Sequence, residues 1–186
     1  MLESTYNKRS REGAKEAGLI RLYPDPILRR RAREVKPGSP AAREAAQRLR
    51  QALSQVEGLG LAANQVGALV RVVLARLGAR EWVLINPEVA WRSPELETDS
   101  EGCLSLPGVE AEVARPAQIR VRALSEAGEE LLLELEGLEA RLLLHEIDHL
   151  DGGLYIDHLA AAERRRVLRE YRRARELAEE GVPSRE

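Results

Sequence analysis

The segment LLHEIDHLDG, residues 143–152, places two histidines four positions apart and a glutamate directly after the first. In an α-helix, side chains four residues apart lie on one face, so His145 and His149 can bind the same metal ion. Glu146 then lies beside the ion without binding it, where it can deprotonate a water molecule. This HExxH pattern is typical of zinc hydrolases, although it also occurs by chance in surface helices. A catalytic site of this kind needs a third protein ligand and one open position.

The residues that follow this segment offer poor third ligands. A longer zinc-binding pattern would require histidine where the chain has Tyr155, and His158 lies beyond a Gly-Gly break, so we expect it on the surface. Glu163 or Glu170 could complete a thermolysin-like site, but both lie in AERRRVLREYRRAR, where arginines are simpler partners. Cys103 remains, and a thiolate is a good ligand for a borderline-soft dication.

The overall composition narrows the class of protein. The chain has 186 residues and a formal net charge of −2, which suits one domain and indicates no general attraction to nucleic acid. No apolar run approaches the roughly 20 residues that span a bilayer. Cys103 is the only cysteine, so no disulfide can form within the chain, and a reducing cytoplasm is the expected location. We expect residues 1–18 to be a loose extension and residues 19–186 to be a single catalytic domain.

Hydrophobic spacing and turn residues predict an α+β fold in which small mixed or antiparallel sheets pack around the HExxH helix. The expected elements are an extended then helical segment at 22–35, a helix at 40–56, strands at 68–77 and 81–89, a hairpin at 119–125 and 130–137, the metal helix at 138–150, and a charged terminal helix at about 160–180.

Three sequence blocks occur in an order that resembles the bacterial peptide deformylases. They are GLGLAANQVG (58–67), EGCLSLPG (101–108) and LLHEIDHLDG (143–152), and the resemblance extends over roughly residues 20–180. It implies removal of the formyl group from the N-terminal formyl-methionine of new proteins. It also implies the following roles: metal ligands Cys103, His145 and His149; general base Glu146; oxyanion donors Gln65, through its side-chain amide, and Leu104, through its backbone N–H.

The resemblance further implies a substrate site. The backbone of Leu59, Gly60 and Gly102 would pair with the substrate as an added strand, although a plain bulge or turn also explains these glycines. Leu138 and Leu142 fall on the helical stripe of the two histidines and would line the pocket for the methionine side chain, or else belong to the ordinary core.

Family likeness also gives the metal and the partners. One divalent ion is expected, Fe²⁺ natively, with Zn²⁺, Ni²⁺ or Co²⁺ as occupants of purified protein. The resemblance implies nascent formylated peptides as substrates and contact of the basic terminal helix with the ribosome near its exit tunnel. A solvated surface helix with Glu–Arg pairs four residues apart explains the same segment, and the protein is expected to be a monomer. Two rival functions are a peptidase with a His₂Glu site and a ribosome-associated or structural metal protein without activity.

Two residues depart from the family pattern, and one pairing is expected. Leu144 stands where many deformylases have glutamine, and Asp99 stands near the rim of the methionine pocket, where a small or apolar residue is common. Asp148 is expected to support the metal site from behind, with Arg115 as its partner.

Overall fold

The computed structural model describes residues 18–179, so nearly all of the expected N-terminal extension lies outside the described residues. The elements, in chain order, are η1 (Pro26–Arg29), α2 (Pro40–Leu53), β1 (Gly60–Ala62), η2 (Ala63–Val66), β2 (Val72–Leu77), β3 (Arg80–Arg92), β4 (Leu96–Cys103), β5 (Leu106–Pro116), β6 (Gln118–Leu124), β7 (Glu130–Glu136), α3 (Gly137–Leu150), η3 (Tyr155–His158) and α4 (Ala161–Glu179).

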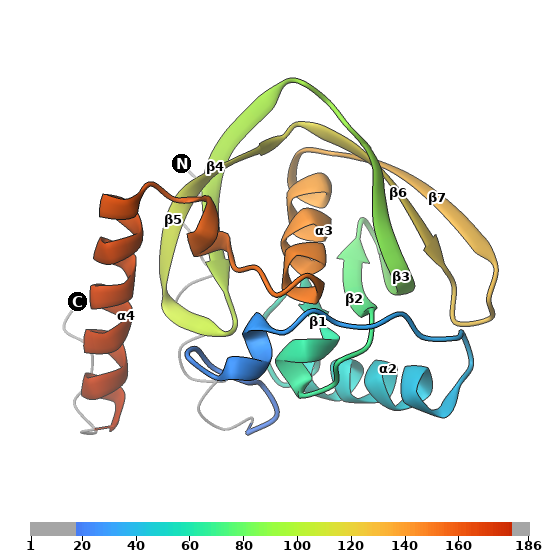
Figure 1. Cartoon of the computed structure of the whole chain (residues 1–186), viewed down its shortest axis with the longest axis horizontal. Helices are drawn as coiled ribbons and strands as arrows, with labels where there is room; N and C mark the ends of the chain where they lie inside the picture. The colour runs from blue at the N-terminus through green and yellow to red at the C-terminus, as the bar shows by residue number, and fades with distance from the viewer. Residues whose placement is uncertain (1–17, 180–186) are drawn as a thin grey trace.

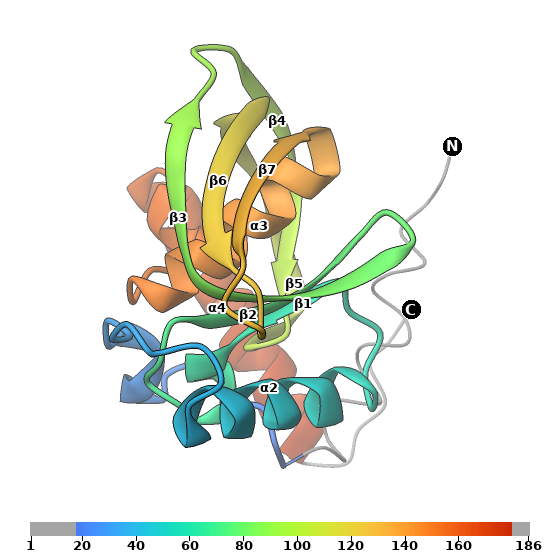
Figure 2. The ribbon, with the colours of Figure 1, turned by 90° about the vertical axis from the view of Figure 1, so that its right-hand side faces the viewer.

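Five strands form one antiparallel sheet in the order β1-β2-β3-β6-β7. The predicted hairpin at 119–125 and 130–137 is confirmed as β6–β7, and the predicted strands at 68–77 and 81–89 pair with each other as β2–β3. Their turns contain Gly78 at φ +57° and Gly128 at φ +90°, backbone conformations that side chains with a Cβ rarely adopt. The sheet curves around the metal helix, as Figure 2 shows for β3, β6 and β7.

Helix α3 lies at the centre of the molecule, between the sheet and the β4–β5 hairpin (Figure 1). Leu143, Leu144, Ile147 and Leu150 on one face pack against buried residues of β2, β3 and β6. The helix ends because Gly152 turns the chain at φ +81° and the Gly153 N–H donates to the carbonyl of Asp148 at 2.8 Å. The predicted helix at 138–150 is therefore confirmed within one residue.

Strands β4 and β5 form a separate two-stranded sheet that the sequence did not reveal. The first five residues of β4, 96–100, are all exposed, so the strand lacks the apolar alternation by which strands are recognised. The inner face of β5 packs with η3 and α4 in a core that includes Leu106, Val113, Ile156 and Tyr171. Helix α4 therefore covers the hairpin at the edge of the molecule, and its prediction at about 160–180 is confirmed.

Two other expectations require correction. Residues 22–35 form only the 3₁₀ turn η1, because the following segment stays extended: the Ala32 N–H donates to the Leu150 carbonyl at 2.7 Å, and Arg33 forms an isolated bridge with Val70. That bridge also explains why β2 begins at Val72 and not at residue 68.

Among the described residues, no helix has the length and apolar composition needed to cross a bilayer.

Candidate metal centre

Three side chains from two elements converge in the interior. Cys103 ends β4, while His145 and His149 occupy successive turns of α3. Their potential ligand atoms all lie within 4.8 Å of one another, and all three residues are buried. The Cys103 Sγ is 3.2 Å from the His149 Nε2. The structure therefore brings together the three residues that the sequence analysis selected as ligands.

A buried carboxylate behind the cluster orients one imidazole. The His145 Nδ1 is 3.0 Å from the Glu101 Oε2, which leaves the His145 Nε2 directed at the cluster. Arg115 binds both oxygens of Glu101, at 2.8 and 2.9 Å, and Arg141 binds one of them at 2.8 Å. Sequence analysis missed Glu101 and Arg141, although Arg141 lies four residues before His145 and was therefore predictable on the same helix face.

The electrostatics favour a thiolate and so fit a divalent cation. Burial opposes ionisation of the thiol, but the nearby imidazole of His149 and contacts with His145 outweigh it, and the pKa of Cys103 lies well below its usual range. Burial likewise opposes the charge on Glu101, yet hydrogen bonds from Arg115 and His145 hold the pKa of this carboxyl well below its ordinary value. A deprotonated sulfur beside two imidazoles is a donor set suited to a first-row metal ion.

The Glu146 carboxylate lies beside the cluster without belonging to it. Burial raises the pKa of Glu146 to about 7. Its Oε2 has no hydrogen-bond partner among the described residues, which is rare for a buried polar atom. A water molecule at the metal site would provide the missing partner. A Cβ added to Gly60 would lie 2.8 Å from the Glu146 Oε1, so a larger residue here would displace the carboxylate.

The amide of Gln65 is held in one orientation on the thiolate side. Its Oε1 accepts a hydrogen bond from the Ala62 N–H at 2.8 Å, and its Nε2 donates to the Ser105 Oγ at 3.1 Å. The same Nε2 lies 3.7 Å from the Cys103 Sγ. Leu104 is buried directly after Cys103, so its backbone N–H belongs to the same turn.

The proposed substrate residues lie around this cluster. Strand β1, which contains Gly60, is an edge strand of the five-stranded sheet, and the carbonyl of Leu59 accepts a hydrogen bond from the Arg76 N–H. Gly102 lies beside Cys103 at a bulge of the hairpin. Leu142 is half-buried, and its Cδ1 would lie 3.0 Å from a Cβ at Gly60.

Leu138 is 63% exposed, so its alternative interpretation as ordinary core is wrong.

The alternative third ligands lie elsewhere. Glu163 and Glu170 both bind Arg166, as their arginine-rich context predicted. His158 is exposed and is absent from the ligand cluster, but it is 2.8 Å from the Asp148 Oδ2. The expected pair of Arg115 and Asp148 is confirmed, with 2.6 Å between the Nη1 and the Oδ2.

The two departures from the family pattern have different surroundings. Leu144 is buried in the core between α3 and the sheet, away from the ligand side of the helix. Asp99 has an exposed side chain, while its backbone carbonyl lies 3.4 Å from the Arg141 Nη1.

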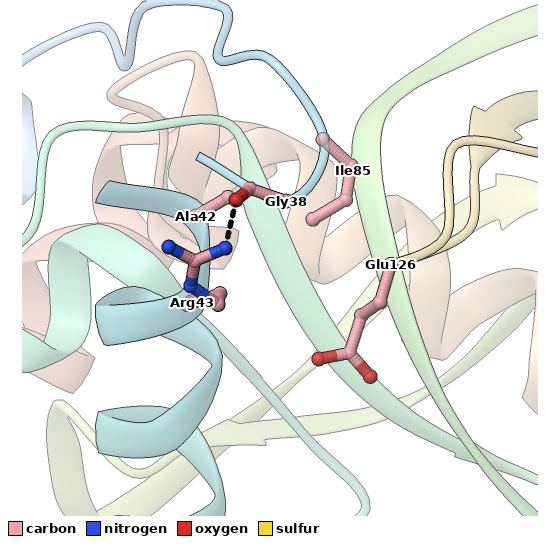
Figure 3. Close-up of a pocket in the computed structure, with 5 residues that line it drawn as sticks. All are labelled: Gly38, Ala42, Arg43, Ile85 and Glu126. Atoms are coloured by element: carbon pink, nitrogen blue, oxygen red, sulfur yellow. Dashed lines mark hydrogen bonds between the residues drawn. The ribbon is translucent and has the colours of Figure 1, made fainter. Parts of the chain in front are cut away.

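A small hollow on another surface is not a rival site. It is bounded by Gly38, Ala42, Arg43, Ile85 and Glu126, and Figure 3 shows Arg43 and Glu126 on its opposite sides. Its volume of about 20 Å³ is enough for about one water molecule. These residues belong to α2 and the turn before it, to β3 and to the β6–β7 turn, not to the elements that hold the ligand cluster.

Comparison with known proteins finds relatives that are described as peptide deformylases. A family model described as polypeptide deformylase matches residues 18–165. The chain is 43% identical to the peptide deformylase of Natranaerobius thermophilus over 74% of this chain and 89% of that protein. It is 45% identical to that of Alkalilimnicola ehrlichii over 81% and 86%, respectively. The crystal structure of peptide deformylase from Thermus thermophilus is similar, with a TM-score of 0.76 and 41% identity over 86% of this chain and 98% of that one.

Proposed function

The chain belongs to the polypeptide deformylase family, and from this premise we propose which of its residues carry out the reaction. The enzyme is a hydrolase that removes the formyl group from the N-terminal formyl-methionine of newly synthesised proteins and releases formate. The assignment of the site rests on the convergence of Cys103, His145 and His149, whose ligand atoms lie within 4.8 Å of one another.

These three residues would hold one divalent metal ion. When bound, such an ion supplies a Lewis acid and lowers the pKa of an attacking water toward neutrality. Cys103 would contribute a charged sulfur and the two histidines neutral nitrogens, which leaves one position open for the reaction. Glu101 keeps the His145 ring in the orientation that directs its Nε2 at the site.

Glu146 would act as the proton carrier. A pKa of about 7, caused by burial, lets this carboxyl exchange protons near neutral pH. It would take a proton from the attacking water through its unpartnered Oε2 and then deliver that proton to the nitrogen of the leaving amine. The formyl carbon thereby gains an oxygen from water and loses its bond to nitrogen, which yields formate and a free methionine amine.

Gln65 and Leu104 would stabilise the charge that develops on the formyl oxygen. The Gln65 amide is fixed at both ends by hydrogen bonds, so its N–H group is oriented before the substrate arrives. The Leu104 N–H would add a second donor from the turn after Cys103. Each such donor is typically worth about 10²–10³ in rate.

The substrate would enter along the open edge of β1. In an antiparallel pair, backbone groups of alternate residues point toward the partner strand. The Leu59 carbonyl already accepts the Arg76 N–H, so the pairing expected of Leu59 with the substrate does not have that group to use. The groups of Gly60 instead point to the unpaired edge of β1, where an extended peptide would add as a strand. Gly102 would bind the opposite side of the bound peptide, and Leu138 and Leu142 would contact its methionine side chain.

Formate release from formyl-Met-Ala-Ser tests this assignment. Cys103→Ala should lose both metal and formate release, because two imidazoles alone do not complete the site. As a matched control, the double substitution Glu163→Ala and Glu170→Ala should retain both. Retention of metal and activity by the Cys103 variant, with loss in the control, would instead support a peptidase-like His₂Glu site.

We also propose Fe²⁺ as the native metal, on family likeness and because iron expands its coordination more readily than zinc beside a thiolate. Enzyme prepared without oxygen should lose activity in air over minutes to hours, because O₂ that reaches the ion can oxidise both ferrous iron and the thiolate of Cys103 beside it. Nickel-loaded enzyme should stay active under the same treatment. Equal activity and equal air stability of iron-loaded and zinc-loaded enzyme would contradict this choice of metal.

The terminal helix supports a proposal about the partner. Arg165, Arg169, Arg172 and Arg173 are exposed on α4 at spacings that place them along one side of the helix. We propose that this side contacts ribosomal RNA near the exit tunnel, where nascent chains emerge, and that the enzyme works in the cytoplasm as a monomer. Changing the four arginines to glutamine should weaken co-sedimentation with ribosomes and leave hydrolysis of formyl-Met-Ala-Ser unchanged. Analytical ultracentrifugation tests the monomer.

A further inference from the structure

A single buried carboxylate joins the metal helix to the hairpin that carries the cysteine. Glu101 lies on β4, two residues before Cys103, and its side chain is only 4% exposed. It contacts the His145 imidazole and two guanidinium groups, those of Arg115 and Arg141. Removing one of these donors would alter the position or the basicity of the group that orients a metal ligand.

The two arginines reach Glu101 from different elements. Arg115 belongs to β5 and so holds Glu101 from within its own hairpin, while its Nη1 binds Asp148 of α3 at 2.6 Å. Arg141 belongs to α3 and lies one helical turn before His145. Arg141 and His145 therefore approach the same carboxylate side by side, from one face of one helix.

Arg141 also fastens the helix to both strands of the hairpin. Its Nη1 donates to the Val113 carbonyl at 2.7 Å, and its Nη2 donates to the Glu97 carbonyl at 2.7 Å. No other carboxylate binds its side chain among the described residues, so Glu101 alone offsets its buried charge. The acceptors are divided between the two Nη atoms of the guanidinium, and a lysine, whose donors all lie on one nitrogen, does not reproduce this arrangement.

These contacts define the relative position of the elements that supply the ligands. Cys103 belongs to β4, whereas His145 belongs to α3. We propose that Arg141 is a positioning residue of the metal centre: it fixes Glu101 against α3 and thereby sets the orientation of His145 relative to Cys103. This inference rests on the proposed function, since it assumes that these residues hold a metal ion.

Cobalt substitution provides the test, because the visible spectrum of bound Co²⁺ reports ligand geometry independently of activity. Arg141→Met should shift the cobalt bands and weaken metal affinity by about 10- to 100-fold, as is typical for groups that support a metal ligand. Arg141→Lys keeps the charge and should show the same spectral shift with a smaller loss of folding stability. Glu101→Gln should reproduce the loss of affinity, and the double substitution should cost less than the sum of the two single ones.

Leu143→Ala is the matched control for stability. Leu143 is fully buried on the same helix but packs on the sheet, away from Glu101, so its truncation should lower Tm and leave the cobalt spectrum unchanged. A wild-type spectrum and wild-type affinity in both Arg141 variants, or additive losses with Glu101→Gln, would overturn the proposal. A cobalt spectrum of the wild type that Cys103→Ala does not change would overturn the metal site itself and this proposal with it.

Discussion

Replacing Glu146 by glutamine should stabilise the metal-free protein at neutral and alkaline pH. Burial raises the pKa of Glu146 to about 7 from its usual 4.5, so the folded state binds this proton more tightly than the unfolded state. The contribution of Glu146 to stability is therefore fully present below pH 4.5 and is lost as the pH rises toward 7. The free energy that corresponds to this difference in pKa is about 3 kcal/mol.

The measurement is the free energy of unfolding by urea, for metal-free wild type and metal-free Glu146→Gln, between pH 5 and pH 8. The advantage of the variant should grow by about 2–3 kcal/mol across this range, because the other titrating groups are shared and largely cancel. Glu139→Gln, at the first turn of the same helix, controls for the loss of one negative charge.

The same variant separates stability from function. Glu146→Gln should retain metal, because the carboxylate is a proton carrier and not a ligand, but it should lose nearly all formate release. If the difference in unfolding free energy between wild type and variant did not change with pH, the conclusion that burial raises the pKa of Glu146 would be wrong. If metal content fell in parallel with activity, the conclusion that Glu146 is not a metal ligand would be wrong.

Three further substitutions test other contacts. Gln65→Ala should lower kcat by roughly 10²–10³ with little change in KM, because its hydrogen bond strengthens in the transition state; a change in KM alone would show ground-state binding instead. Gly60→Ala places a Cβ 2.8 Å from the Glu146 Oε1, so kcat should fall by roughly 10²-fold while Tm stays within a few degrees of wild type. Gly152→Ala combines φ +81° with a Cβ 2.7 Å from the Arg29 carbonyl oxygen, and urea denaturation should show a loss of at least about 2 kcal/mol with metal ligands intact.

The convergence of Cys103, His145 and His149 was predictable from sequence because these residues follow simple rules. His145 and His149 have helical spacing, and Cys103 is the only thiol in the chain. The two hairpins were predictable because short apolar segments, rich in β-branched residues in β2 and β3, flank a turn that contains glycine. The roles assigned to Gln65, Leu104 and the substrate-binding residues remain predictions until they are tested by substitution.

The support behind the ligands was not predictable, because it depends on contacts between distant segments. Strand β4 is mostly exposed and polar, so no hydrophobic period marks it. Its inward residue Glu101 is recognisable only once α3 brings Arg141 and His145 against it, 40 and 44 residues later in the chain. Local spacing placed Arg141 on the helix face of His145, but only the packing of the hairpin gave that arginine its acceptors.

The separation of the β4–β5 hairpin from the main sheet has a consequence for local opening. A two-stranded sheet is marginally stable by itself, and this one is held by packing against α4 and by side-chain contacts to α3. A bound ion would link Cys103 to His145 and His149 and so hold hairpin and helix closed in proportion to its affinity. Removal of the metal by a chelator should therefore speed hydrogen exchange at the amides of β4 and β5 far more than at those of β2 and β3. On this account a bound metal would suppress the local opening of the hairpin half of the molecule.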